Sequence, residues 1–171
     1  EQLDVHGTPI DHLKKVAPGL GEKACREYLA AYHFRGERVF EAVGPFSGGE
    51  KARLALALVV FGKPNLLLLD EPSSGLNVEE TEDMAFWIAD IKNELGITVL
   101  MVEHDMSLVS RVSDRVLAMN QGEVLAMGSP MDVQTHPGVI EAYLGSADDA
   151  TSLRRPSADH ALHAGSIRGQ A

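Results

Sequence analysis

The sequence predicts an α/β domain built around a mainly parallel sheet. Residues 66–69 and 97–102 are short, continuously apolar runs, which are typical of strands buried on both faces. Between them, residues 78–95 repeat apolar side chains every three or four positions, which predicts an amphipathic helix. Buried strands that alternate with helices form parallel sheets, and ligands bind at the carboxyl ends of such strands.

The part of the chain before the first strand is expected to be helical. Thr8, followed by proline and then by an acid three residues on, is a helix start. A second helix is expected over 22–34, and 36–45 is expected to be a loop. Ser47 and Glu50 have the spacing of a capping box, which predicts a helix that continues to about residue 61.

The part of the chain after the second strand is expected to contain a hairpin and short helices. A Gly-containing turn over 120–122 separates two short apolar segments, which predicts antiparallel pairing. The expected elements are a helix over 106–113, strands over 115–119 and 123–127, and short helices that begin at Ser129 and His136. Residues 146–171 hold few large aliphatics and no aromatic residue, which predicts a disordered tail.

Composition and charge narrow the class of protein. Apolar residues make up 44% of the 171 residues and charged residues 23%, as in a globular protein with a core. No apolar run approaches the ~20 residues that span a bilayer. The net charge of −10 argues against nucleic acid or an anionic membrane as a direct partner. Cys25 is the only cysteine, so no disulfide within the chain is expected, and a reducing cytoplasm is the expected compartment.

Two adjacent carboxylates follow the first predicted strand. Asp70 and Glu71 come directly after four leucines and directly before a proline. Mg²⁺ prefers hard oxygen ligands and keeps several waters. In nucleotide hydrolysis one carboxylate can hold the metal through water while the next orients or deprotonates the attacking water. The alternative interpretation is a solvated acidic loop, which the apolar run before the pair disfavours.

Three further features accompany these carboxylates. Ser47, Gly48 and Gly49 open a helix, and free amides at a helix start suit a phosphate; an ordinary helix cap is the alternative. His104 directly follows the second strand and its Glu103, from where it can reach a terminal phosphate, although a lone histidine is more often structural. Residues 73–77 form a polar turn between the carboxylates and the next helix.

Together these motifs resemble the ATP-binding-cassette (ABC) ATPases, which have a P-loop NTPase-like fold, over about residues 20–145. Ser47-Gly48-Gly49-Glu50 is similar to the family signature, and residues 66–71 look like the Walker B strand with its glutamate. Ser74-Gly75-Leu76-Asn77 resembles the D-loop, and His104 resembles the switch histidine. Glu50 replaces the commoner glutamine of the signature. Asn77 stands where the family usually has aspartate, which puts coupling through that side chain in doubt.

The resemblance implies a role for each matching residue. Asp70 would hold Mg²⁺ through water, Glu71 would be the general base or water-orienting group, and His104 would contact the γ-phosphate. The signature would contact the γ-phosphate of an ATP held by a second cassette. The nucleotide-binding set implied in this way is Ser47, Gly48, Gly49, Glu50, Ser74, Gly75 and Asn77.

One essential motif of the family does not occur in the sequence. No Gly-x-x-x-x-Gly-Lys-Ser/Thr, the Walker A loop that cradles phosphates, is found. We therefore expect a cassette whose N-terminal part is missing. Its expected divisions are a partial helical subdomain over 1–45, the signature, Walker B, D-loop and switch-histidine part over 46–145, and the tail over 146–171.

The two halves resemble different branches of the family. Residues 1–72 resemble the second cassette of the soluble, ribosome-associated ABC-F proteins, and residues 73–145 resemble the ATP-binding subunits of branched-chain amino acid importers. The join falls inside a motif that both branches share, which suggests a recombined, engineered or misassembled chain.

The main functional hypothesis is a truncated importer cassette that hydrolyses ATP with Mg²⁺ only when a partner supplies Walker A. Its expected partners are a second ABC cassette and a membrane permease subunit, at the inner face of the cell membrane. One alternative is a fragment of an ABC-F-type ATPase that acts at the ribosome. Another is a catalytically dead binding or dimerisation module.

Overall fold

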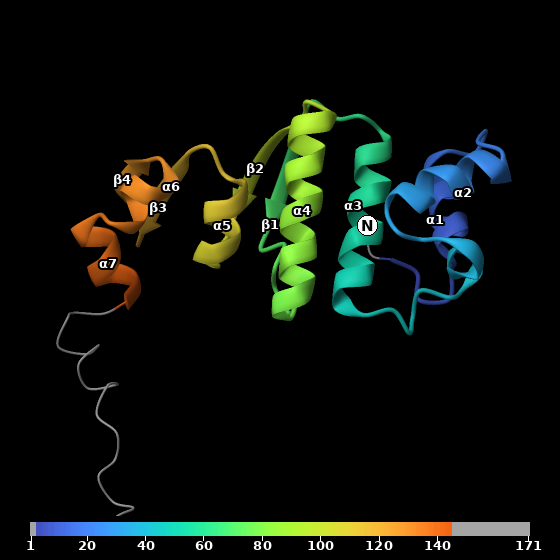
Figure 1. Ribbon diagram of the computed structural model, residues 1–171, viewed down its shortest axis with the longest axis horizontal. Helices are drawn as coiled ribbons and strands as arrows, with labels where there is room; N and C mark the ends of the chain where they lie inside the picture. The colour runs from blue at the N-terminus through green and yellow to red at the C-terminus, as the bar shows by residue number, and fades with distance from the viewer. Residues whose placement is uncertain (1–2, 145–171) are drawn as a thin grey trace, which may run out of the picture. The chain divides into compact units, whose positions relative to one another are not determined.

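A computed structural model describes residues 3–144, which form two compact units that divide after Ser113 (Figure 1). The first unit contains α1 (Pro9–Val16), α2 (Glu22–Ala31), the 3₁₀ helix η1 (Gly36–Phe40), α3 (Gly48–Phe61), β1 (Leu66–Asp70), α4 (Val78–Glu94), β2 (Thr98–Val102) and α5 (Met106–Val112). The second contains β3 (Val116–Asn120), β4 (Glu123–Gly128), α6 (Pro130–Gln134) and α7 (Pro137–Leu144). The predicted tail over 146–171 lies outside the described residues, and the predicted division at residue 45 stays a prediction.

Helix starts follow the local capping chemistry of the sequence. Thr8, Ser47 and Ser129 each begin a helix, as predicted, and each does so with a capping box, as does Asn77 for α4. In each box the cap side chain accepts the amide of the third helical residue, whose own side chain accepts the amide of the cap. Helix ends were less predictable: α2 stops at Ala31 instead of 34, and the expected loop after it contains η1.

Helix α3 lies in the middle of the first unit. It contacts α1 on one side and α4 on the other, and α4 in turn contacts β2 and α5 (Figure 1). Leu54 of α3 and Ile88 of α4 are buried in one core that also takes in residues of α1 and α2. Val16, the last residue of α1, and Leu95, just after α4, are about half exposed, because each lies at the end of its helix beyond the packed core.

Strands β1 and β2 form a parallel pair, with Leu66 beside Thr98 and Asp70 beside Val102. Alternate side chains, among them those of Leu67 and Val99, face the core. The prediction that both faces are buried is wrong for this pair. The other face exposes the side chains of four aliphatic residues by more than half: Leu66, Leu68, Leu100 and Val102. The reason is that the core of this unit covers only one face of the pair, while side chains alternate along each strand. We call these four residues the open sheet face.

The second unit is the predicted antiparallel hairpin with two short helices. Its strands pair from Val116 with Gly128 to Asn120 with Glu123, with an irregularity after Ala118. Ala118, Val133 and Val139 make a small core that joins the hairpin to α6 and α7. In neither unit is a described helix long and apolar enough to cross a bilayer.

Candidate functional site

The carboxyl ends of β1 and β2 bring the predicted catalytic residues together. The Glu71 amide donates to the carbonyl oxygen of Val102 at 2.9 Å, so Glu71 stays attached to the end of β2. Its backbone is left-handed, with φ at +46°, a strained conformation for a residue with a side chain. Glu71 Oε1 lies 3.7 Å from His104 Nδ1, and both side chains are more than half exposed. The structure thus brings Glu71 and His104 together, while their roles stay predictions.

Glu103 also lies at the carboxyl ends of β1 and β2, and the sequence motifs indicated no role for it. Its side chain is fully buried. Its Oε1 accepts the amide of Ser73 at 2.8 Å and also the Ser73 hydroxyl. Its Oε2 accepts the amides of His104 at 2.8 Å and Asp105 at 3.0 Å. Ser73 and Glu103 lie 30 residues apart, and their spacing in the sequence does not predict this contact. The pairing of β1 with β2 brings the two residues together.

These hydrogen bonds hold Glu103 in its charged form. Burial raises the pKa of the Glu103 carboxyl, but the bonds from the Ser73 side chain and from the amides of Asp105, Ser73 and His104 lower it by more. The net result is a pKa below the ordinary glutamate value. Such bonds to a carboxylate favour ionisation and offset the cost of removing the charge from water.

We predict that Glu103 links stability to acid pH. Because its pKa is lowered in the folded state, the unfolded chain binds more protons, so the stabilisation is present above about pH 4.5 and is lost as pH falls through the lower folded pKa. Urea unfolding between about pH 5 and 3 should therefore show a slope of free energy against pH that is shallower in Glu103→Gln, by up to about one bound proton. Glu94→Gln, at the exposed end of α4, is the surface control. An unchanged slope in Glu103→Gln would refute the prediction.

The predicted signature lies at the start of α3, where several of its amides already donate hydrogen bonds within the protein. The Glu50 amide donates to Ser47 Oγ at 3.2 Å, and the Ser47 amide donates to Glu50 Oε2 at 2.9 Å. Arg38 also donates to the Glu50 carboxylate, and its guanidinium lies over the Phe46 ring, 4.1 Å from the centroid. Burial raises the pKa of Glu50, but the Arg38 and Ser47 bonds outweigh it and the net pKa is lowered. The Glu50 carboxylate is therefore already bonded to Arg38 and to the Ser47 amide within the protein.

A carboxylate from α4 reaches the same helix start. The Gly49 amide donates to Glu80 Oε1 at 3.0 Å. A Cβ at residue 49 would lie 2.7 Å from Glu80 Cγ, so the Glu80 side chain would have to move if residue 49 were not glycine. Hydrogen bonds from the Ser47 side chain and from the Asn77 and Gly49 amides hold the pKa of Glu80 below its ordinary value. An anionic group thus already lies where the resemblance places a phosphate.

The predicted D-loop connects the two clusters. Gly75 has φ at +73°, which glycine adopts without strain. A Cβ built on Gly48 would lie within 3.4 Å of Leu76 and 3.6 Å of the Gly75 carbonyl oxygen, so this loop passes beside the start of α3. The Asn77 side chain accepts the Glu80 amide at 3.0 Å and caps α4, while Ser74 is exposed and donates its amide to the Glu71 carbonyl.

Asp70 suits a metal ion whose other ligands are mostly water and phosphate oxygens. It is exposed at the last position of β1, at the same edge as Glu71 and His104. Among residues 3–144 no three acidic, histidine or cysteine side chains are arranged to hold a metal by themselves. Mg²⁺ in nucleotide sites is held by one or two carboxylates, water and phosphates, so a single aspartate at this edge suits Mg²⁺ that arrives with a nucleotide.

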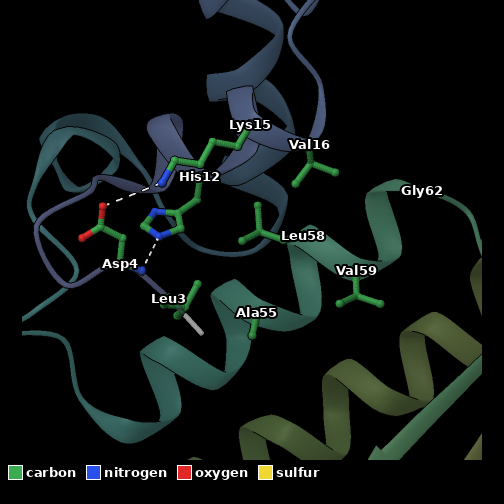
Figure 2. Close-up of a pocket in the computed structure, with 9 residues that line it drawn as sticks. All are labelled: Leu3, Asp4, His12, Lys15, Val16, Ala55, Leu58, Val59 and Gly62. Carbon is green, nitrogen blue, oxygen red and sulfur yellow. Dashed lines mark hydrogen bonds and ion pairs between the residues drawn. The ribbon is translucent and has the colours of Figure 1, made fainter. Parts of the chain in front are cut away.

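A hollow of about 370 Å³ lies away from these clusters, between α1 and α3 (Figure 2). Its polar groups are paired with each other or with the backbone. The Asp4 amide donates to His12 Nε2 at 2.9 Å, and His12 Nδ1 lies 2.8 Å from the Thr8 carbonyl oxygen. Lys15 Nζ lies 3.7 Å from Asp4. No predicted site residue lines this hollow, so it is not part of the candidate site.

Comparisons with known proteins show which families and which known fold this chain resembles. Residues 21–74 match the model of the ABC transporter family, and residues 123–149 match that of the branched-chain amino acid ATP-binding cassette transporter. Two solved structures share the fold. The ADP conformation of MJ1267, an ATP-binding cassette of an ABC transporter, has a TM-score of 0.67 and 20% identity over 82% of this chain and 63% of its own. CbiO1 from Clostridium perfringens has a TM-score of 0.66 and 25% identity over 86% and 61%. The chain therefore shares the fold of part of an ATP-binding cassette, as predicted.

The curated relatives include more than one kind of ATP-binding protein. The high-affinity branched-chain amino acid transport ATP-binding protein BraF of Pseudomonas aeruginosa is 43% identical over 62% of this chain and 42% of its own length. LivG of Escherichia coli, with the same description, is 44% identical over 58% and 39%. The probable ATP-binding protein YheS of Escherichia coli is 39% identical over 72% of this chain and 19% of its own. The chain thus spans about two fifths of the length of the branched-chain relatives. The match over 123–149 agrees with the predicted character of that half, while the join at residue 72 stays a prediction.

Proposed function

We propose that this chain supplies the signature and catalytic-carboxylate part of an ATP-hydrolysing cassette of the branched-chain amino acid importer type. The observation that carries the proposal is the placement of Glu71 and His104 with 3.7 Å between their side chains at the carboxyl ends of two paired parallel strands. The relatives BraF and LivG, both described as branched-chain amino acid transport proteins, support the importer assignment.

In this proposal the residues at the sheet edge act on the terminal phosphate. Glu71 orients the attacking water or takes its proton, and His104 donates to the γ-phosphate. Asp70 holds Mg²⁺ through water, and that ion neutralises phosphate charge when bound. Preorganised groups of this kind stabilise charge that develops in the transition state.

The start of α3 acts on a different nucleotide, one held by a second cassette. Ser47 and the amides of Gly48 and Gly49 face its γ-phosphate, as the family resemblance implies. The Gly49 amide is already bonded to Glu80, so in this proposal the phosphate displaces that carboxylate when the two cassettes close.

We propose that the Walker A loop, which we also call the phosphate loop, comes from another segment. The 171 residues contain no Gly-x-x-x-x-Gly-Lys-Ser/Thr, and the open sheet face offers an aliphatic surface against which such a segment can pack. We use the term completed cassette for this chain joined to a segment that carries the phosphate loop. The assembly would act with a permease subunit at the inner face of the membrane.

The signature role can be tested by complementation. We would mix this chain with an intact cassette whose own signature serine is replaced, so that the cassette alone is inactive. If the α3 start completes the other site, ATP hydrolysis should return on mixing. Ser47→Ala should then lower the restored rate by roughly tenfold or more, because a single preorganised donor to a developing charge contributes on that order or above.

Ser129→Ala is the matched control. Ser129 also begins a helix with a capping box, so its loss carries the same kind of capping cost without touching the α3 start. No return of activity in a mixture whose complex is confirmed by light scattering, or equal loss in the two serine variants, would refute the signature role.

One observation favours a second function, that of a binding or dimerisation module without catalysis. The Glu80 carboxylate occupies the start of α3, and such a contact is compatible with a cassette that binds a partner but no phosphate. Calorimetry of this chain with Mg-ATP, alone and with the intact cassette, separates the two. Complex formation that ATP does not strengthen supports the module, and ATP-dependent complex formation supports the cassette.

A further inference from the structure

Glu103 is a buried carboxylate that contacts two separate loops, one through each oxygen. Oε1 receives the amide and the hydroxyl of Ser73, which lies two residues after Glu71. Oε2 receives the amides of His104 and Asp105, at the start of the segment that leads into α5. The four donors thus divide evenly between the loop that carries Glu71 and the loop that carries His104.

Burial makes this contact difficult to replace. The Glu103 side chain is fully buried and Ser73 is buried as well, so the Ser73 donors do not regain a bond to water when Glu103 is lost. A buried donor without an acceptor is costly. Glutamine keeps the shape but offers one acceptor oxygen and one donating amide group, so it can serve only one of the two loops. Aspartate is one methylene shorter and cannot span the same gap.

The position of Glu103 relates directly to the candidate catalytic pair. His104 Nδ1 lies 3.7 Å from Glu71 Oε1 and 3.7 Å from Glu103 Oε2. The Glu71 backbone is bonded to Val102, the residue before Glu103. Both residues of the pair therefore sit on segments whose backbone is held at or next to Glu103.

We propose that Glu103 is a positioning residue that sets the placement of Glu71 relative to His104. It contacts neither the reacting water nor the phosphate, and acts by binding the two loops to one carboxylate. Its effect on catalysis rests on the function proposed above, whereas its effect on the loops does not.

The alternative is a local role in which Glu103 only caps the amides beside it. The two roles differ in what happens when Ser73 is altered. Ser73 lies 30 residues from Glu103 in the chain and bonds to it from the other loop. If the carboxylate joins the loops, loss of the Ser73 hydroxyl must weaken the hydrogen bonds that the His104 and Asp105 amides donate to Glu103. If the cap is local, the His104 and Asp105 amides are unaffected.

Amide hydrogen exchange of the full chain, followed by NMR without nucleotide, distinguishes these roles. In Ser73→Ala the amides of His104 and Asp105 should exchange roughly threefold to tenfold faster, as expected when a hydrogen bond to a charged group weakens. In Glu103→Gln the amides of Ser73, His104 and Asp105 should all exchange roughly tenfold faster or more. Ser107→Ala, which removes an exposed hydroxyl close to the same loop, should leave these rates unchanged.

Unchanged exchange at His104 and Asp105 in Ser73→Ala overturns the proposal, whatever Glu103→Gln does. The exchange result in Ser73→Ala does not depend on the stability of the glutamine variant, because Ser73→Ala retains the buried carboxylate and its three backbone donors.

Steady-state kinetics of the completed cassette adds a catalytic readout. A positioning role predicts that Ser73→Ala lowers kcat roughly tenfold while KM for ATP stays within about twofold, because only the transition state needs the aligned pair. A raised KM with unchanged kcat overturns the catalytic part. If the completed cassette with the natural sequence does not hydrolyse ATP, the proposed function fails, while the exchange result still decides whether Glu103 joins the loops.

Discussion

Replacing Glu71 with glutamine should lower ATP hydrolysis by the completed cassette by roughly 100-fold or more, the usual loss when a general base or water-orienting carboxylate is removed. The substitution keeps the size of the side chain, so binding of Mg-ATP should be retained and the loss should fall on kcat. Phosphate release measured under saturating ATP, with affinity measured separately by calorimetry, gives both quantities.

The structure also predicts what this substitution should leave unchanged. The Glu71 side chain is 55% exposed, and glutamine fits the same left-handed backbone, so the urea midpoint of the chain should stay at the natural value. Glu94→Gln, which removes a surface carboxylate from the end of α4, should retain full turnover. Turnover of Glu71→Gln within twofold of the natural rate would remove Glu71 from its proposed role.

The largest loss of stability is expected at Leu54. This residue lies at the centre of α3 with no exposed surface, inside the core that joins α1, α2 and α4. Leu54→Ala removes buried methyl groups and leaves a cavity, which should lower the free energy of unfolding by about 3–5 kcal/mol. Urea denaturation followed by circular dichroism would measure the change.

Val59 provides the control within the same helix. Its side chain is 53% exposed, so Val59→Ala removes little buried surface, and alanine also favours the helix. The expected change is within about 0.5 kcal/mol of zero. A loss at Leu54 no larger than that at Val59 would show that the core around α3 is not the source of stability in the first unit.

The local elements were predictable because their causes are local. Thr8, Ser47 and Ser129 each place a hydroxyl three residues before an acid, and the resulting capping box satisfies the first amides of a helix without help from the rest of the chain. The hairpin around residues 120–122 also formed as predicted. Helix ends depend instead on what the last turn packs against, and for that reason the predicted end of the second helix at residue 34 was wrong.

The candidate site was predictable only in part. Asp70 and Glu71 follow one strand and His104 follows the next, and parallel strands necessarily bring these ends to one edge. The bond between Gly49 and Glu80 was not predictable, because it depends on the packing of α3 beside α4. The contact of Glu103 with Ser73 likewise requires the register of β1 on β2.

From the amino-acid sequence it was possible to infer where the α-helices begin, which runs form strands, and which residues the family motifs mark. Those properties follow from capping, periodicity and residue type, which act over a few neighbouring positions. Three features emerged only once the chain was folded: one face of the β1–β2 pair is open, Glu80 occupies the start of α3, and Glu103 bonds to two loops. Each of these depends on which side chains meet across separate segments, and a linear pattern of residue types does not specify that.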